Sequence, residues 1–121
     1  MLRCILLLLG ATVLAGKAWA IEEFVIEIRD HLFYPSRVTL PAFKKVKLVI
    51  RNLDDTPEEF DSFDLNREKV IFAKRSAVIY VGPLQPGTYV FFGEYNPNTA
   101  RGEVLVRDPA ESSALESDSA H

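Results

Sequence analysis

Carboxylates carry most of the distinctive chemistry of this sequence. Between Asp54 and Glu68 the chain has a run of acidic residues against a single basic residue, Arg67. The acidic residues of this run are Asp54, Asp55, Glu58, Glu59, Asp61, Asp64 and Glu68. Carboxylates that a fold holds close together raise one another's pKa, unless a cation or a hydrogen-bond donor lies among them. The run therefore predicts either a cation site or a strongly acidic, solvated surface.

Apolar side chains are interleaved with these acids. Phe60 and Phe63 flank Asp61, and the pair Glu58 and Glu59 comes immediately before them. Because large aromatic residues are usually buried, part of the acidic run must fold against a hydrophobic core. We therefore expect some of its carboxylates to be held in fixed positions.

Residues 1–20 have the pattern of a secretory signal peptide. Arg3 precedes an apolar stretch over residues 4–14, and Ala18-Trp19-Ala20 forms a small-x-small cleavage site. The apolar stretch is too short for a membrane span. We expect cleavage after Ala20, a mature chain that begins at Ile21, a periplasmic location and no membrane insertion after cleavage.

Loss of this leader would remove all sulfur from the chain. The sequence has one cysteine and one methionine, and these are Cys4 and Met1. A mature chain without thiolates excludes iron-sulfur clusters, cysteine nucleophiles and cysteine-based zinc sites. The remaining histidines are His31 and His121.

The charge of the chain argues against nucleic acid as a partner. With 14 basic and 17 acidic residues the net charge is −3, and it becomes −5 once Arg3 and Lys17 leave with the signal peptide. A protein that binds phosphates needs a positive surface. Enzyme motifs are also absent from the sequence, which has no Gly-rich phosphate loop, no Gly-x-Ser-x-Gly and no His-Glu-x-x-His.

The elements that position the acids are predicted to be short β-strands. Apolar residues alternate with polar ones over residues 24–28, 46–50, 77–81, 89–91 and 104–106. Pro- and Gly-containing turns separate these segments. The pattern predicts one all-β domain over residues 21–107, a Greek-key β-sandwich of six to eight short strands. Residues 68–74 are compatible with a short helical turn, and residues 108–121 read as a disordered acidic tail.

Several motifs together resemble a known fold family. The segments His31-Leu-Phe-Tyr-Pro35 and Leu84-Gln-Pro-Gly87-Thr-Tyr89 resemble cupredoxin-like domains of secreted bacterial proteins. The blocks Pro57–Lys69 and Phe91–Ala100 resemble more specifically the EfeO-type cupredoxin-like domain, whose stand-alone relatives accompany periplasmic iron-uptake systems. The resemblance implies a cupredoxin β-sandwich over residues 21–107.

The resemblance also implies which metal sites are missing. Blue-copper cupredoxins hold copper with His, Cys, His and Met. In this chain those positions fall on Glu59, near Gly93, on Asn96 and near Ala100. No type-1 copper site is therefore expected. Relatives of the iron-associated type often have histidine where this chain has Phe63 and Asn96.

What the resemblance retains is a set of oxygen ligands with one imidazole. The matching metal-site candidates are Glu59, Glu94, Glu68, Asp61 and His31. Glu59 and Glu94 are expected in loops that meet at one end of the sandwich, with His31 at the same end. Such ligands suit iron or another hard cation.

Two functions follow as alternatives. One is an accessory to metal uptake, specifically of iron, that works with membrane iron permease components; a ferroxidase-like activity is implied only by the family resemblance. The other is a degenerate, metal-free cupredoxin that acts as a protein-interaction module and uses its acidic end as a docking face.

Overall fold

The computed structural model describes residues 10–12, 16 and 20–111. Nine strands form within these residues. They are β1 (Glu23–Arg29), β2 (Leu32–Tyr34), β3 (Arg37–Pro41), β4 (Val46–Asn52), β5 (Glu58–Ser62), β6 (Arg67–Ile71), β7 (Ser76–Val81), β8 (Gly87–Gly93) and β9 (Arg101–Arg107). The all-β prediction is confirmed, although the strands outnumber the expected six to eight.

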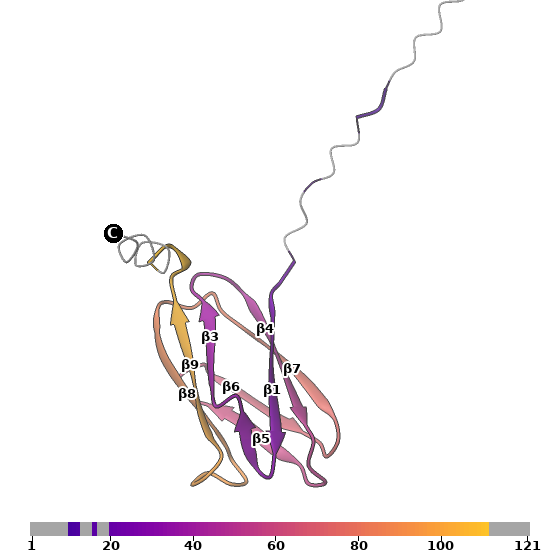
Figure 1. Ribbon diagram of the computed structural model, residues 1–121, viewed down its shortest axis with the longest axis vertical. Coiled ribbons are helices and arrows are strands. Elements are labelled where there is room, and N and C mark those ends of the chain that lie inside the picture. Colours follow the sequence, from indigo (N-terminus) through magenta and orange to yellow (C-terminus); the bar gives the residue numbers. More distant parts are fainter. Residues whose placement is uncertain (1–9, 13–15, 17–19, 112–121) are drawn as a thin grey trace, which may run out of the picture.

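The strands form two sheets packed face to face (Figure 1). One sheet has the order β2-β1-β4-β7 and the other has the order β3-β9-β8-β5-β6. The pairs β1 with β4 and β3 with β9 are parallel, and the other pairs are antiparallel. In Figure 1, strand β1 starts and strand β9 ends at the top of the sandwich, so the β8–β9 loop and the β1–β2 turn lie at the bottom.

The core lies between the sheets, on the faces that the alternating pattern predicts. Ile26 and Ile28 of β1 are fully buried, as is Leu48 of β4. At the lower end three aromatic rings meet: Phe60 stacks on Phe91 at 4.9 Å between centroids, and Phe33 packs edge-on against Phe91 at 5.0 Å. Burial of each such side chain stabilises the fold by about 1.5–3 kcal/mol. This aromatic layer fixes strand β5 against the opposite sheet.

The helical turn expected over residues 68–74 is wrong. Arg67–Ile71 forms strand β6, which pairs antiparallel with β5. The turn between them is closed by a hydrogen bond from Asn66 N to Phe63 O, and Asn66 has a left-handed φ of 53°. Asn adopts this conformation more easily than most residues. Pairing with β5 therefore decides the conformation of a segment whose local sequence permits either.

The predicted leader and tail lie largely outside the described residues. Described residues 109–111 form a short helical turn, in which Ala110 N and Glu111 N bond to the side chain and carbonyl of Asp108. Within the described part of the chain no helix is long and apolar enough to cross a bilayer. The signal peptide, its cleavage after Ala20 and the disordered tail remain predictions.

Candidate metal centre

Strand β5 presents acids on both of its faces. Side chains along a strand point alternately to opposite sides. Glu58 and Phe60 therefore share the inner face, toward the buried aromatic layer, and Glu59 and Asp61 share the outer face. The two consecutive glutamates have opposite environments because they differ by one position in a strand.

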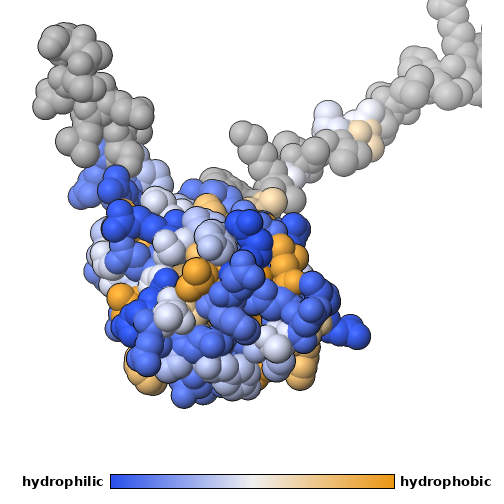
Figure 2. All heavy atoms as spheres, turned by 60° about the horizontal axis from the view of Figure 1, so that its bottom comes forward, coloured by the Kyte–Doolittle hydropathy of each residue, from blue (hydrophilic) through white to orange (hydrophobic). Residues whose placement is uncertain are grey.

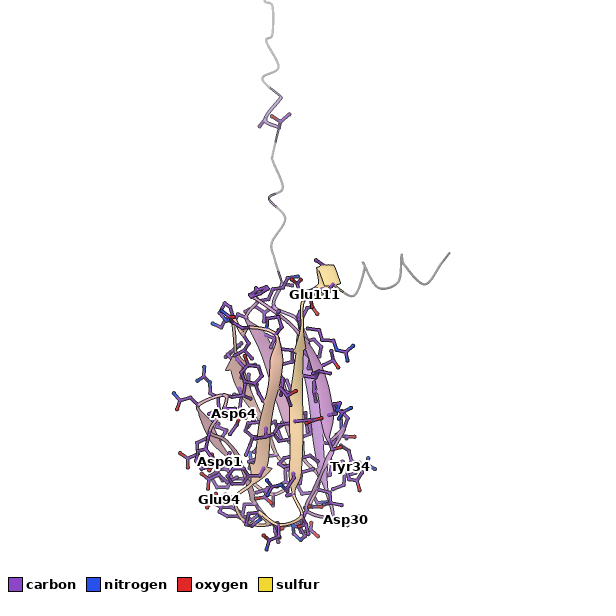
Figure 3. All side chains as sticks on the ribbon, turned by 90° about the vertical axis from the view of Figure 1, so that its left-hand side faces the viewer. Asp30, Tyr34, Asp61, Asp64, Glu94 and Glu111 are labelled. Carbon is purple, nitrogen blue, oxygen red and sulfur yellow. The ribbon has the colours of Figure 1, made fainter. Side chains whose placement is uncertain are left out.

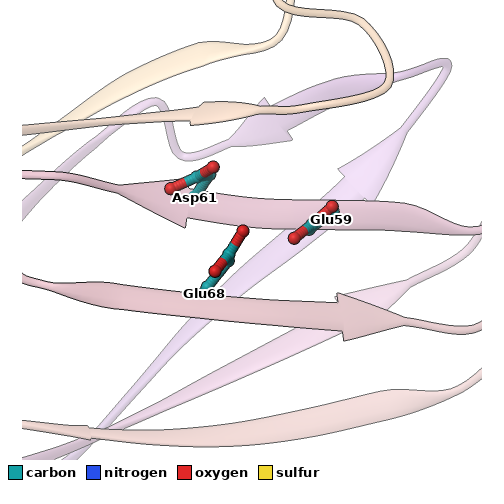
Figure 4. A group of neighbouring side chains, drawn as sticks. All are labelled: Glu59, Asp61 and Glu68. Carbon is teal, nitrogen blue, oxygen red and sulfur yellow. The ribbon is translucent and has the colours of Figure 1, made fainter.

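Three carboxylates gather on the outer face. Glu59 and Asp61 of β5 and Glu68 of β6 each offer an oxygen atom within 4.8 Å of those of the other two. Asp61 and Glu68 are register partners across the two strands. Figure 4 shows the three carboxyl groups converging from the neighbouring strands. We call these three residues the carboxylate trio.

Asp61 is the most unusual member of the trio. It is only 7% exposed, and within the described part of the chain its carboxylate accepts no hydrogen bond from the protein, but no side-chain oxygen there is both buried and unpaired, so its oxygens still reach solvent. Its other register partner is Phe92 of β8, whose ring lies 5.6 Å from that of Phe63. A carboxylate with so little exposure beside two further carboxylates is favourably placed for a positive charge.

Partial desolvation and the crowding of carboxylates raise the pKa of Glu59. Partial desolvation raises its pKa first of all, followed by a side-chain hydrogen bond with Glu68 and by the negative charges of Glu68, Asp61 and Glu94. A cation among the trio would relieve the repulsion that helps to raise the pKa of Glu59.

Glu94 lies near the trio, and its charge acts on Glu59, but its carboxylate is outside the group whose oxygen atoms all lie within 4.8 Å of one another. It follows β8 directly, and its backbone N–H donates to the carbonyl of Glu59 at 2.9 Å. Figure 3 shows Glu94 and Asp61 on the same side of the sandwich. Glu94 is in the expected β8–β9 loop, whereas Glu59 lies in strand β5 and not in a loop. The candidate site thus belongs to the face of the five-stranded sheet near its lower end.

His31 is engaged elsewhere. Its Nδ1 lies 3.8 Å from Oδ2 of Asp54, and the backbone N–H groups of Asp30 and His31 donate to the same carboxylate at 2.8 and 2.9 Å. Asp30 and His31 form the β1–β2 turn with φ values of 51° and 61°. Figure 3 places Asp30 on the side of the sandwich away from Asp61. The structure therefore brings together Glu59, Asp61 and Glu68 with Glu94 adjacent, and leaves His31 outside that group.

Glu58 is the functional candidate that sequence reasoning missed. It is 1% exposed, and its carboxylate accepts three hydrogen bonds: Oε1 from the backbone N–H groups of Glu59 and Tyr95 at 3.0 and 2.9 Å, and Oε2 from Asn96 Nδ2 at 2.8 Å. Its spacing of two from Phe60 was the available signal, since residues two apart share one face of a strand.

The region where the resemblance puts type-1 copper does not fit that metal. Gly93 has no side chain, and a Cβ atom there would lie 2.6 Å from Glu58 Cδ and 2.8 Å from Ala100 Cβ. The Asn96 amide is turned toward the same Glu58 carboxylate. The carboxylate thus fills the space among Gly93, Asn96 and Ala100, and none of these three residues offers the sulfur or imidazole ligand that type-1 copper requires.

Comparison with known proteins agrees with the architecture. A family model described as the cupredoxin-like domain matches residues 2–106. A protein of Rickettsia prowazekii described as uncharacterized is 46% identical over 88 residues, which is 73% of this chain and 70% of that protein. Both findings concern the sequence itself.

Solved structures with this fold include copper proteins. Amicyanin from Paracoccus versutus has a TM-score of 0.58 at 18% identity, covering 74% of this chain and 85% of amicyanin. The metal-binding domain of the Cu(I)-exporting ATPase CopA from Streptococcus pneumoniae has a TM-score of 0.62 at 14% identity, covering 73% and 87%. At these identities the likeness concerns the fold alone. The family model, which matches most of the sequence, shows that this chain belongs to the cupredoxin-like domain family.

Proposed function

We propose that this protein is a periplasmic, cupredoxin-like accessory to metal uptake that binds a hard cation, iron in particular, through Glu59, Asp61 and Glu68. One observation carries the proposal. The Asp61 carboxylate is nearly buried, receives no hydrogen bond within the described residues, and lies within 4.8 Å of two further carboxylates. A cation among the three would offset the mutual repulsion of their charges.

The ligand chemistry favours a hard cation. All three groups of the trio are carboxylates, which suit Fe(III), Mn(II) and similar ions, whereas Cu(I) prefers sulfur. The negative charge of Glu94 also acts on Glu59, although the Glu94 carboxylate lies outside the trio's 4.8 Å group. When ionised, the trio alone carries three negative charges, enough to balance a ferric ion. Iron is further supported by the resemblance of the Pro57–Lys69 block to EfeO-type domains.

The proposed physiological setting follows from the leader and the resemblance. A chain exported by the predicted signal peptide would meet metal ions in the periplasm. Membrane iron permease components are the proposed partners, to which a shallow site on a sheet face would release its ion. Such a site exchanges ions more readily than a closed cage does.

Calorimetric titration of the purified protein with Fe(III)-citrate, Mn(II), Cu(II) and Zn(II) tests this function. We expect saturable binding of Fe(III) or Mn(II), weakened about tenfold in Asp61→Asn. Absence of binding of all four metals at micromolar concentration would contradict the proposal.

A second function is favoured by a separate observation. Phe63 is 80% exposed and its ring lies 5.6 Å from that of Phe92, next to the trio. Apolar surface of this kind, adjacent to acidic groups, is typical of a docking face. The protein would then be a metal-free interaction module. In that case Phe63→Ser would abolish capture of a permease component. Neither the parent nor Asp61→Asn would bind a cation.

A further inference from the structure

The buried Glu58 carboxylate joins two segments that are far apart in sequence. Its Oε1 accepts from Glu59 N in strand β5 and from Tyr95 N in the β8–β9 loop. Its Oε2 accepts from the side chain of Asn96 in the same loop. One buried carboxylate thus fastens the start of this loop to the strand that carries two members of the trio.

Glu94 lies between these attachments. Its own N–H donates to Glu59 O at 2.9 Å, and the next N–H, that of Tyr95, donates to Glu58 Oε1 at 2.9 Å. Two consecutive amides of the loop are therefore bonded to two consecutive residues of β5. Beyond this point the loop residues Pro97, Asn98 and Thr99 are exposed. Within the loop, Gly93 N donates to Ala100 O and Ala100 N donates to Asn96 O, both at 2.8 Å, and the Glu58 contacts join this closed loop to β5.

We propose that Glu58 is a positioning residue which holds the β8–β9 loop against β5, so that the Glu94 carboxylate serves as the fourth ligand of the cation bound by the trio. The inference rests on the proposed cation site and assigns to it a residue that touches no metal. The Glu58 carboxylate occupies the space beside Gly93 and Ala100, where the resemblance puts type-1 copper. Because no copper ligand set is present there, we assign Glu58 a structural role as an anchor of the loop.

Glu58 itself is not a ligand. Every neighbour of its oxygens is an N–H donor: two backbone amides and one side-chain amide. A cation placed there would face the positive ends of three dipoles. The side chain also points to the inner face of β5, whereas the trio lies on the outer face.

Substitutions separate anchoring from ligation. Glu58→Gln keeps an oxygen for the two backbone donors, and its amide can face Asn96 if that side chain turns its oxygen inward. Glu58→Ala removes all three acceptor contacts. Asn96→Ala removes only the contact to Oε2 and serves as a milder variant should Glu58→Ala fail to fold.

The test is a double-mutant cycle of Mn(II) affinity, measured by calorimetry on the purified protein. We expect Glu94→Gln and Glu58→Ala each to weaken binding about tenfold, and the double variant to bind no more weakly than Glu58→Ala. Glu58→Gln should bind within about threefold of the parent, and Asn96→Ala should weaken binding about threefold. Amide exchange at Tyr95 in the metal-free protein should accelerate in Glu58→Ala and stay slow in Glu58→Gln.

Two outcomes overturn the inference while the proposed function stands. One is a parent that binds Mn(II) and a Glu58→Ala variant, or failing that an Asn96→Ala variant, with unchanged affinity. The other is a Glu94→Gln effect that is undiminished in the Glu58→Ala background. A parent that binds no metal overturns the proposed function and the ligand role of Glu94 together, even if Tyr95 exchange shows that Glu58 anchors the loop.

Discussion

Carboxylates on the two faces of strand β5 have opposite environments. On the inner face the Glu58 carboxylate is fully buried and receives three hydrogen bonds. On the outer face the carboxylates of Glu59 and Asp61 meet a third carboxylate, Glu68, and the pKa of Glu59 is raised. One position along the strand separates an acid that is satisfied by the protein from acids that are not.

This difference indicates which acids are available for binding. A carboxylate surrounded by N–H donors has its charge compensated within the fold and gains little from a cation. Carboxylates that face one another gain a great deal, because a cation removes their mutual repulsion. Burial alone therefore does not identify the site, since Glu58 is more buried than any member of the trio. The identity of the neighbouring groups does.

The largest expected effect on stability is on the inner face. Glu58→Leu leaves two backbone N–H groups and the Asn96 amide without their acceptor, so we expect the free energy of unfolding to fall by about 3–5 kcal/mol. Urea denaturation of the metal-free protein measures this. Glu59→Gln, one residue away on the outer face, is the control and should cause no loss. Equal losses in the two variants would remove the distinction between the faces.

A smaller loss is expected at Gly93. An added methyl group would lie 2.6 Å from Glu58 Cδ and 2.8 Å from Ala100 Cβ, so the buried carboxylate must shift. We expect Gly93→Ala to lower the free energy of unfolding by about 2 kcal/mol. Combination with Glu58→Ala, which removes the obstructing carboxylate, should cost less than the sum of the single changes. Strict additivity would show that Gly93 and Glu58 are independent.

On the outer face the expected effect is on binding. Glu59→Gln, Asp61→Asn and Glu68→Gln each remove an oxygen ligand charge, and each should weaken Mn(II) binding about tenfold in calorimetry. Glu111→Gln, far from the site at the other end of the sandwich in Figure 3, is the charge-matched control and should bind like the parent. A uniform weakening that includes Glu111→Gln would indicate a diffuse electrostatic effect.

The smallest effect is the pH dependence of stability. The pKa of Glu59 is raised above its ordinary value of 4.5, so the folded protein holds this proton more tightly than the unfolded chain does. The resulting stabilisation is present below pH 4.5 and is lost as the pH rises through the raised pKa. Urea denaturation at pH 4 to 7 should show the metal-free parent losing stability relative to Glu59→Gln. If the free energies of unfolding of the parent and of Glu59→Gln changed in parallel with pH, the pKa of Glu59 would not be raised by its neighbours.

Much of the fold could be predicted because the alternation of apolar residues is strong. Ile26, Ile28 and Leu48 are buried as the period of two requires. Strand β6 was missed because Glu68 and Lys69 have no apolar alternation of their own, and only pairing with β5 makes this segment a strand. A weak local pattern is decided by its neighbour in the sheet.

The site was predictable in composition but not in geometry. The sequence identifies an acidic run, and the structure assembles three of its members across two strands. It could not separate Glu58 from Glu59, because the face that each one takes depends on the register of β5 with the core. The surface of the lower end is predominantly hydrophilic, as Figure 2 shows, so exposed acids alone do not mark the trio.

The central claim is that the outer face of β5 binds a cation and the inner face does not. Anomalous diffraction from crystals of the protein soaked in Mn(II) tests it most directly. We predict a peak about 2.2 Å from carboxylate oxygens of Glu59, Asp61 and Glu68, with Glu94 completing the coordination. A peak beside Glu58 or between His31 and Asp54, or no peak at saturating Mn(II), would contradict the account.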